Sequence, residues 1–560
     1  MSSLAGESAR PTTSRRVNTA DHLVRSAARR GAEDAVRAYG RKGWHSATFA
    51  ELEQRSSAIA SGLAGLGLQR GDRVSVFLRP GVELIAVTYA LFKLGAVPVL
   101  IDPGMGRQAL ASCIERAAPR ALIAVPAAQV FRALHPTPFR SVELTVVNAP
   151  RWPFGAPTLS DVERRGSTSF EPVDTTADDL AAVLYTSGST GPAKGVAYTH
   201  GMFDAQVRTL RALYGFQPGE VDVACFPLFA LFDVAFEMTS VFPKLDPSRP
   251  GRCNPALVVD ALRTHEATNT FGSPAIWRRV APWCVARGIR LDRLQRILVA
   301  GAPVPPALIA RCHSILGPDG DVYTPYGATE SLPVASIDGR TILRLRERTE
   351  GGAGTCVGGP APEIEIRLIQ ITDQPIERWD DALLVPDGEL GEICVRGPVV
   401  TRSYVDEPAA TNASKIVDGE RFWHRMGDVG YRGPDGRLWF CGRKAHRLET
   451  REGLCMPVPT ENVVNLHPRV RRSALVGVGR RGQERPTLIV EPEDKDLLRA
   501  AGGADELRAE LRTLLDARWR EGEPPAVERV RLHRGLPVDV RHNAKIRREV
   551  LKRWAEGLAP

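Results

Sequence analysis

The sequence predicts an α/β fold: a large N-terminal part of mainly parallel sheets flanked by helices, followed by a small α+β part. Two observations predict it. Between about residues 20 and 440, short apolar runs alternate with amphipathic stretches, as in parallel strands joined by helices. The composition, with 43% apolar and 25% charged residues over 560 positions, is that of a globular protein with an ample core.

The apolar runs give the order of the elements. Buried strands are predicted at residues 73–78, 96–101, 121–125, 143–147, 180–184 and 296–300, with a helix at 81–94. The segment 84–101 is the most membrane-like, but Lys93 and Gly95 interrupt it, so a buried helix running into a strand is expected. From about residue 389 we predict a smaller sheet with strands at 392–396 and 437–441, then strands at 474–478 and 487–491 and a helix at 504–518.

Three segments are expected along the chain. Residues 1–20 are predicted to be a disordered leader, because the first sixteen contain no apolar stretch and so no signal peptide. The charged segment 442–447, GRKAHR, is predicted to be a loop. A boundary near Gly442 therefore separates a large domain at 21–441 from a small domain at 442–560.

Charge and cysteine usage exclude several protein classes. The formal charge is +9, yet the basic residues are scattered among acids, and no zinc finger or basic tract occurs. A nucleic-acid-binding protein is therefore disfavoured, and so is an integral membrane protein. The nine cysteines include no C-x-x-C pair, which favours reduced thiols and a cytoplasmic location.

Residues 185–196, YTSGSTGPAKGV, carry the strongest chemical signal. Glycines let the backbone approach an anion, hydroxyls donate hydrogen bonds, and Lys194 adds a point charge. The candidate ligands of a phosphate are Thr186, Ser187, Gly188, Ser189, Thr190, Gly191 and Lys194. The alternative is a polar surface turn. A Walker P-loop is disfavoured, because Ala193 stands where glycine is required and Gly195 where Ser or Thr binds magnesium.

This loop resembles the phosphate loop of the adenylate-forming superfamily, which includes acyl-CoA synthetases, luciferases and peptide-synthetase adenylation domains. Pro192 comes one place early relative to that pattern. Further segments match in the family's order. VAGAPV at 299–304 resembles the loop against adenine, with Gly301, Ala302 and Pro303. YTPYGATE at 323–330 resembles the segment that places Tyr326 and Gly327 at adenine, Thr329 at the α-phosphate and Glu330 at Mg²⁺.

Two more segments complete the resemblance. FWHRMGD at 422–428 implies that Asp428 accepts the ribose hydroxyls. Gly442 with Arg443 resembles the start of the family's hinge, which implies that Arg443 lies near the ribose or the phosphate. NAKIRR at 543–548 implies that Lys545 reaches the carboxylate and the α-phosphate. The resemblance thus implies ATP and Mg²⁺ as cofactors, and an acyl-AMP formed by attack of a carboxylate on ATP. Lys545, Thr329, Glu330 and Lys194 are the implied catalytic residues, and the small domain is implied to be mobile.

Departures from the pattern favour one branch of the superfamily. The segment 227–230, PLFA, lacks the histidine usual in acyl-CoA synthetases, and residues 448–453, LETREG, replace their Gly-Gly. The hinge position that usually carries a carboxylate is Ala445. DPGMG at 102–106, FPLFALF at 226–232 and VFPKLDPSRP at 241–250 resemble the β-lactone synthetases of bacterial long-chain olefin pathways.

That resemblance implies closure of a 2-alkyl-3-hydroxy fatty acid, through its adenylate, to a β-lactone. It also implies pathway partners: a thiolase, a reductase and a hydrolase-like enzyme. A long-chain acyl-CoA or acyl-AMP ligase is the alternative, and a catalytically inactive binding protein is a third. The base for the β-hydroxyl is open, with a structural role as the alternative for each candidate by residue type: His200, Asp233, His424 and His446.

Overall fold

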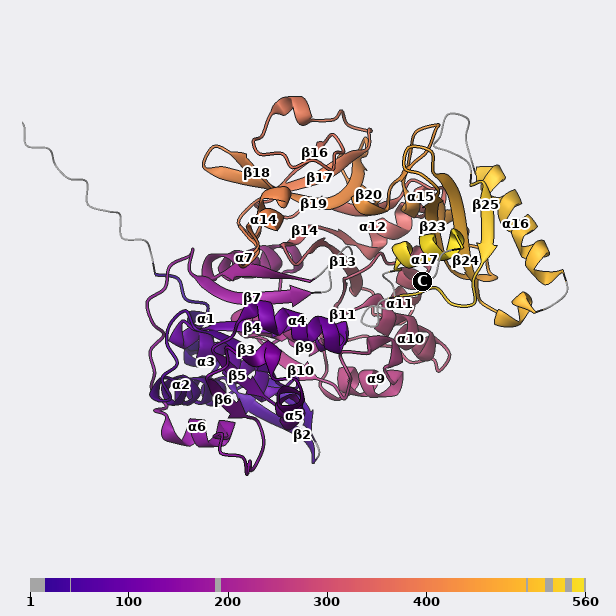
Figure 1. Cartoon of the computed structure of the whole chain (residues 1–560). Helices are drawn as coiled ribbons and strands as arrows, with labels where there is room; N and C mark the ends of the chain where they lie inside the picture. The colour runs from indigo at the N-terminus through magenta and orange to yellow at the C-terminus, as the bar shows by residue number, and fades with distance from the viewer. Residues whose placement is uncertain are drawn as a thin grey trace, which may run out of the picture.

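The computed structural model describes residues 16–40, 42–186, 193–499, 502–518, 527–538 and 546–557. Its strands form a 14-stranded sheet, a 6-stranded sheet, a 3-stranded sheet and a 2-stranded ribbon. Helices pack around the two large sheets, and the 3-stranded sheet lies at one end of the molecule (Figure 1). The predicted α/β class is confirmed.

The 6-stranded sheet carries the predicted phosphate loop. Its order is β6-β5-β3-β4-β7-β8, parallel throughout except for the antiparallel pair β7 and β8. The strands are β3 (Arg73–Phe77), β4 (Val97–Ile101), β5 (Ala121–Ala124), β6 (Leu144–Val147), β7 (Leu180–Thr186) and β8 (Lys194–Thr199). The helices are α2 (Phe49–Gly65), α3 (Val82–Leu94), α4 (Arg107–Ala117), α5 (Pro126–Leu134) and α6 (Leu159–Arg165). The predicted strands here are confirmed.

The membrane-like segment is the buried helix α3 followed by β4, as predicted. Gly95 ends the helix with a φ of 69°, a left-handed conformation that favours glycine. Lys93 is fully buried, pairs with the Glu53 carboxylate and donates to Ser57 Oγ at 2.6 Å, and these partners satisfy its charged end inside the core. In the described ranges, no helix is both long and apolar enough to cross a membrane.

The 14-stranded sheet carries most of the remaining site residues. Its order is β16-β17-β19-β20-β15-β14-β13-β12-β11-β9-β10-β1-β2, with β18 beside β19. The strands from β1 to β13 along this path are parallel, whereas those from β14 to β16 are antiparallel. The carboxyl ends of the parallel strands therefore meet at one edge, where ligands of such sheets collect.

The strands of this sheet are β1 (Asp34–Gly40), β2 (Gly43–Thr48), β9 (Val221–Ala224), β10 (Thr239–Phe242), β11 (Asn269–Gly272), β12 (Arg296–Val299), β13 (Asp321–Ala328), β14 (Ser331–Asp338), β15 (Thr355–Pro360), β16 (Glu365–Ile369), β17 (Gly391–Arg396), β18 (Lys415–Asp418), β19 (Arg421–Arg432) and β20 (Leu438–Arg443). Its helices are α1 (Asp21–Arg30), α7 (His200–Tyr214), α8 (Ala230–Phe236), α9 (Pro255–Thr264), α10 (Pro274–Val285), α11 (Pro306–His313), α12 (Gly339–Arg344), α13 (Arg346–Glu350) and α14 (Pro408–Ser414).

Two predictions about the region after residue 389 are wrong. The strands at 392–396 and 437–441 do not form a separate smaller sheet, because β15 pairs with β14 on one side and with β20 on the other. The segment 442–447 is not wholly a loop either. Its first two residues end β20, since Arg443 pairs with Asp428 across the ladder, and Lys444–His446 form a single 3₁₀ turn.

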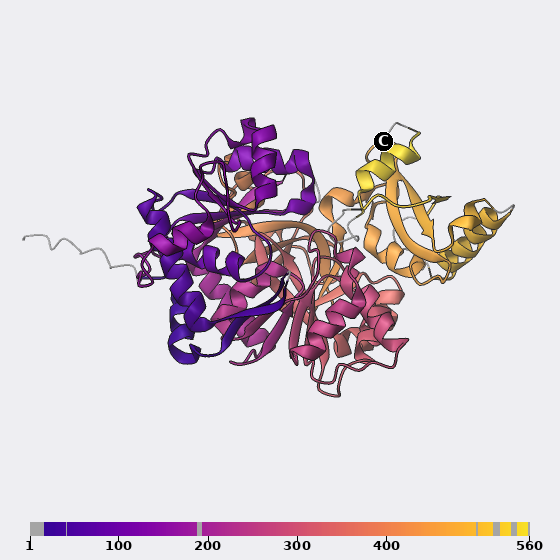
Figure 2. The same ribbon diagram turned by 90° about the horizontal axis from the view of Figure 1, so that it is seen from below.

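The C-terminal part has its own small sheet, β23-β24-β25, seen apart from the two large sheets in Figure 2. Leu507, Leu511 and Leu515 lie four residues apart on one face of α16, and all three are buried in the hydrophobic core of this C-terminal part. The elements are β21 (Leu448–Glu449), β22 (Leu454–Cys455), α15 (Pro457–Val464), β23 (Val470–Val478), β24 (Arg485–Pro492), α16 (Gly503–Arg518), β25 (Arg529–Leu532) and α17 (Arg548–Ala555). The boundary near Gly442 stays a prediction.

The predicted leader is wrong at its last five residues. The Val17 N–H donates to Thr175 O at 2.8 Å, and the Asn18 side chain donates to Phe92 O at 3.1 Å. Ala20 is fully buried at the start of α1. Residues 17–20 therefore pack against α3 and the segment before β7, and residues 1–15 lie outside the described ranges.

Candidate active site

The turn between β13 and β14 carries two of the predicted catalytic residues, Thr329 and Glu330. The Thr329 carbonyl accepts a hydrogen bond from the Tyr198 hydroxyl at 2.6 Å. Gly327 precedes this turn, and a Cβ there would lie only 2.4 Å from the Ser331 carbonyl oxygen. The close approach of the two strands therefore requires glycine and fixes the turn against the sheet.

Asp428, the predicted ribose residue, lies directly opposite Arg443, predicted near the ribose or the phosphate, on the paired strands β19 and β20. Arg443 Nη1 is 3.0 Å from Asp428 Oδ1, and the Tyr326 hydroxyl donates to Asp428 Oδ2 at 2.6 Å. Burial, reinforced by the Asp428 charge, raises the pKa of Tyr326 well above its usual value, so this hydroxyl stays a donor. The predicted adenine and ribose residues thus form one bonded group around a buried carboxylate that can accept two hydroxyls.

Tyr404 joins Glu330 to Lys194. Its hydroxyl donates to Glu330 Oε1 at 2.7 Å, and Lys194 Nζ lies 4.7 Å from the centre of its ring. Burial and the Glu330 charge raise the pKa of Tyr404, which keeps the hydroxyl protonated. A lysine over a tyrosine face gains a cation–π attraction. The structure therefore brings together the cation predicted for phosphate and the carboxylate predicted for the metal.

The two ends of the phosphate loop are paired strand residues. Thr186 ends β7 and Lys194 begins β8, and the two are register partners. A Cβ on Gly195 would lie 2.7 Å from the Tyr185 ring, so the strand after the loop packs closely on that ring. The middle of the loop lies outside the described residues, and with it the predicted ligands Ser187, Gly188, Ser189, Thr190 and Gly191.

Gly301 lies two residues after the end of β12, in the predicted adenine loop at 299–304. Its φ of 95° lies in the left-handed region, which explains the glycine. Ala302 is half-buried and Pro303 is exposed. These residues follow the carboxyl end of a parallel strand, the edge at which the neighbouring β13 leads to Tyr326. Their contact with adenine stays a prediction.

Lys545 lies outside the described residues, but the chain directly after it is anchored. Arg548 begins α17 and donates to both carboxylate oxygens of Glu461 in α15, at 2.7 and 2.6 Å. Both contacts come from the single nitrogen Nη2, and they hold the start of α17 against α15. The role of Lys545 stays a prediction.

Sequence reasoning missed Tyr404, Tyr198 and Lys415. Tyr404 lies 74 residues from Glu330 along the chain, and Tyr198 lies 131 residues from Thr329. Lys415 is a buried lysine on β18 whose Nζ is 3.1 Å from His424 Nδ1. No strand is predicted at 415–418, and lysine is most often an exposed residue, so the sequence contains no signal for the burial of Lys415.

The four candidates for the hydroxyl's base are all shielded from solvent to a large degree. His200 bonds Thr19, and burial lowers its pKa to about 4. Burial lowers the pKa of His446 to about 3 and, with Lys415, lowers that of His424 well below its usual value. Asp233 is fully buried and accepts from the Ser240 hydroxyl. His200 and Asp233 therefore have structural partners, and none of the four is identified as the base.

Residues 23–405 match the family described as AMP-binding enzyme. The chain belongs to the AMP-binding enzyme family.

Two curated relatives resemble this AMP-binding enzyme over almost its whole length. The olefin beta-lactone synthetase of Xanthomonas campestris pv. campestris is 44% identical, over 98% of this chain and 99% of its own. The olefin beta-lactone synthetase of Stenotrophomonas maltophilia is also 44% identical, over 95% and 94%. Among solved structures, the anthranilate CoA ligase AuaEII in complex with anthranoyl-AMP gives a TM-score of 0.79 at 19% identity, covering 97% of this chain and 98% of its own. That structural likeness supports the fold alone.

The residues of this AMP-binding enzyme fit a magnesium ion bound together with a nucleotide. Glu330 offers a carboxylate oxygen, and Mg²⁺ is usually held by one or two carboxylates plus substrate phosphates. No cluster of three or more His, Cys, Asp or Glu side chains suited to a metal occurs among the described residues. Glu330 is thus a candidate ligand for a magnesium ion bound with ATP.

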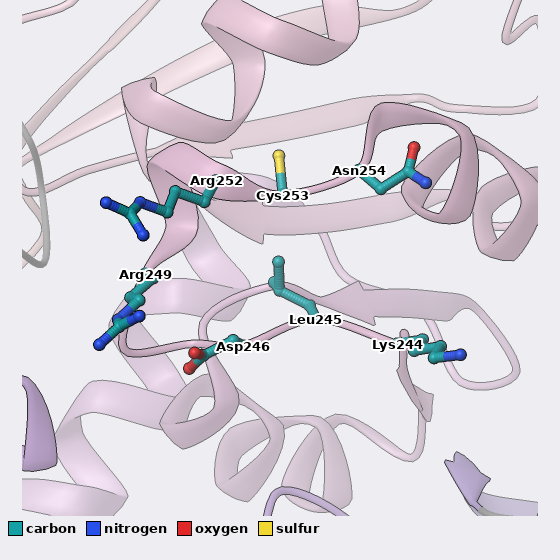
Figure 3. Close-up of a pocket in the computed structure, with 7 residues that line it drawn as sticks. All are labelled: Lys244, Leu245, Asp246, Arg249, Arg252, Cys253 and Asn254. Atoms are coloured by element: carbon teal, nitrogen blue, oxygen red, sulfur yellow. The ribbon is translucent and has the colours of Figure 1, made fainter.

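A cavity of about 270 Å³ lies in the loop that follows β10 (Figure 3). Arg249 and Arg252 lie on one side of it with Asp246, and Lys244 points away from them at the other end. A Cβ on Gly104 would lie 3.6 Å from Ser248 O, so this loop packs beside the DPGMG segment. The charged lining of this cavity does not suit the alkyl chain of a fatty acid.

Proposed function

We propose that this chain is an ATP-dependent β-lactone synthetase acting on a long-chain 2-alkyl-3-hydroxy fatty acid. One observation carries the proposal: 44% identity over 98% of the chain to a protein named olefin beta-lactone synthetase. The absence of a histidine in the segment 227–230 agrees with it. The enzyme class, an acid-activating ligase that forms AMP, follows from the family.

In the first step a carboxylate oxygen of the acid attacks the α-phosphorus of ATP, and pyrophosphate leaves. Negative charge grows on the phosphate oxygens, so cations and donors aimed at them lower the barrier. Lys194 and Lys545 supply the cations in this proposal, and the loop 186–191 supplies the donors. Asp428 accepts the ribose hydroxyls and so sets the position of the α-phosphate.

Glu330 would hold the magnesium ion, which, when bound, neutralises phosphate charge. Tyr404 keeps the Glu330 carboxylate oriented by a hydrogen bond of 2.7 Å. Thr329 lies next to Glu330 on the same turn, with its carbonyl held by Tyr198. The turn is thus fixed before the nucleotide arrives, and such preorganisation reduces the cost of reaching the transition state.

In the second step the β-hydroxyl oxygen of the acyl-AMP attacks the acyl carbon. The hydroxyl loses its proton, the bond from the acyl carbon to the phosphate oxygen breaks, and AMP leaves with both electrons of that bond. A four-membered ring closes without a second substrate. Holding the hydroxyl against the carbonyl can supply effective molarities of up to about 10⁵–10⁸ M.

One incubation separates the proposed function from its alternatives. A racemic 3-hydroxy-2-alkyl acid is incubated with ATP and Mg²⁺ without CoA, and the products are identified by mass spectrometry. A β-lactone with stoichiometric AMP supports the proposal. An adenylate that accumulates until CoA is added supports an acyl-CoA ligase, and one that accumulates regardless supports an acyl-AMP ligase. No pyrophosphate release with any acid indicates a binding protein without catalysis.

We also propose a cytoplasmic location and an assembly with pathway enzymes, a reductase and a hydrolase among them. The nine cysteines are all buried and free, which suits a reducing compartment. Cell fractionation tests the location, and co-purification from cell extract tests the assembly.

A further inference from the structure

Lys415 and His424 form a buried polar pair that the proposed mechanism does not use. They are register partners on β18 and β19, with residue exposures of 8% and 2%. Lys415 Nζ lies 3.1 Å from His424 Nδ1 and also donates to the Thr401 carbonyl. Burying an ammonium group costs free energy, so its bonded partners must be held in place by the fold.

His424 Nδ1 has two neighbours, Lys415 Nζ at 3.1 Å and the Ser414 carbonyl oxygen at 3.2 Å. It accepts from an ammonium only through its lone pair, and it donates to a carbonyl only when it carries the proton. A charged Lys415 therefore goes with a neutral His424 whose proton is on Nε2. The pair is a directional contact rather than two charges side by side.

The other partner of Lys415, Thr401, leads directly to Glu330. The Thr401 N–H donates to the Glu330 carbonyl at 2.8 Å, and the adjacent Val400 forms a bridge with Ser331. Three residues on, Tyr404 bonds the Glu330 carboxylate. The segment 400–404 thus holds Glu330 at both its backbone and its side chain.

Lys415 is the charged side chain that fixes this segment from the side away from the turn. Lys415 donates to the Thr401 carbonyl, and the Thr401 N–H donates to the Glu330 carbonyl. Both backbone polar groups of Thr401 are therefore bonded, one to Lys415 and the other to Glu330. The Glu330 charge also acts directly on Lys415: burial lowers the pKa of this lysine to about 7, and Glu330 opposes that change.

We propose that Lys415, with His424 as its acceptor, is a positioning residue that holds Glu330 ready for a divalent cation bound with the nucleotide. The proposal rests on the proposed function, because the cation arrives with ATP. Removing a side chain that orients a metal ligand typically lowers metal affinity or activity by roughly 10–100-fold. The effect should fall on the Mg²⁺-dependent part of nucleotide binding.

The test measures the Kd of ATP by calorimetry, with Mg²⁺ and with EDTA, in the absence of any acid. In wild type, Mg²⁺ should raise the affinity for ATP. Lys415→Met should weaken Mg·ATP binding about tenfold or more, with little change in EDTA. Lys93→Met is the matched control, since Lys93 is also a buried lysine, bonded to Ser57. It should lower the thermal midpoint and leave the gain from Mg²⁺ intact.

A second pair of variants decides the matter if Lys415→Met does not fold. His424→Leu removes the acceptor and should reduce the gain from Mg²⁺, whereas His424→Asn places a carbonyl oxygen at the position of Nδ1, where it accepts from Lys415, and should restore the gain. Unchanged gains in folded Lys415→Met, or in both His424 variants, overturn the inference. A wild-type protein that binds no ATP under either condition refutes the proposed function itself, a distinct result.

Discussion

Tyr404 donates a hydrogen bond of 2.7 Å to Glu330, and this bond ties the segment after β17 to the turn before β14. The same ring lies under Lys194. One side chain therefore sets the relative positions of a cation and a carboxylate that are 136 residues apart in the chain (330 minus 194).

Tyr404→Phe removes the hydroxyl and keeps the ring beneath Lys194. We expect adenylation to slow by about tenfold, since a hydrogen bond to a charged group contributes roughly 1.5–3 kcal/mol. The rate of adenylation is measured by ATP–pyrophosphate exchange. Tyr431→Phe is the control, because its hydroxyl donates to the Ala353 carbonyl and to none of the candidate site residues. Equal rates for both variants would contradict a role for the Tyr404 hydroxyl.

Asp428→Asn removes the buried charge that pairs with Arg443 and leaves this half-buried guanidinium without its carboxylate. The KM for ATP should rise about 10²-fold while the KM for the acid changes little, because the carboxylate contacts the ribose in our proposal. Asp321→Asn tests the effect of a buried carboxylate elsewhere, since Asp321 pairs with His313 at 2.6 Å. A parallel rise in both KM values would refute the assignment to ribose.

Elements that depend on local sequence could be predicted, whereas elements that depend on pairing between distant residues could not. The strand at Val97–Ile101 follows from one continuous apolar run, and the end of the preceding helix at Gly95 follows from a local stop signal. The extension of β20 to Arg443 does not, because it depends on pairing with Asp428 on another strand. The 14-stranded path depends in the same way on the two partners of β15.

The site divides along the same line. Asp428 and Glu330 stand in motifs whose resemblance to the family was enough to select them. Tyr404 and Lys415 have no such motif, and their importance arises from contacts across 74 residues and through a backbone carbonyl. A single sequence contains no signal for contacts of that kind, because many buried arrangements satisfy one tyrosine or one lysine equally well.

Lys545→Ala should slow adenylation by about 10²–10³-fold, the loss expected for one donor aimed at the developing charge. Lys552→Ala provides the control on α17, where Lys552 pairs with Glu484 at 2.6 Å. Both variants should retain the far-ultraviolet circular dichroism of the wild type. Formation of acyl-AMP by Lys545→Ala at the normal rate would show that another cation does this work.

Asp373 links the region before β17 to the C-terminal part. It pairs with Arg447, beyond the turn that follows β20, at 2.7 Å and with Arg481, between β23 and β24, at 2.5 Å. These bonds and charges hold the pKa of Asp373 well below its usual range, although its partial burial opposes them. Lys444 is tied to the same region through Glu392 at 2.8 Å.

Asp373→Ala should therefore loosen the turn at Lys444–His446. We expect faster hydrogen exchange and faster tryptic cleavage there, with the difference from wild type shrinking at high salt as the exposed part of the network is screened. Asp387→Ala, which removes an exposed pairing with Arg432, serves as the reference. Exchange rates that match in both variants would mean that Asp373 does not restrain the turn.

Asp222 and Asp233 make stability depend on pH in an unusual direction. Both are fully buried, and burial raises the pKa of Asp233 to about 7. Burial and the neighbouring Asp233 raise the pKa of Asp222 well above its ordinary 3.8. Tyr89, Cys225 and Ser240 face the pair, and Arg25 acts on Tyr89 from α1. The folded protein thus holds protons that the unfolded chain has already released.

The direction in which stability changes with pH follows from the number of protons that the folded and unfolded states bind. Between about pH 4 and pH 7 the unfolded state binds fewer protons than the folded state at these two groups, so their contribution to stability falls as pH rises. Asp222→Asn removes one of the two acids. It should raise the thermal midpoint at pH 8 relative to wild type, and do so much less at pH 5.

Asp321 has a lowered pKa, the opposite of the shift at Asp222, so Asp321→Asn serves as the comparison. Burial opposes ionisation there, but hydrogen bonds from His313 and from the Val322 N–H lower the pKa of Asp321. A carboxyl with a lowered pKa contributes stability above its unfolded value and loses it only in acid, so Asp321→Asn should lower the midpoint at both pH 5 and pH 8. Equal shifts of the thermal midpoint at pH 5 and pH 8 for Asp222→Asn would contradict the raised pKa values of the Asp222–Asp233 pair.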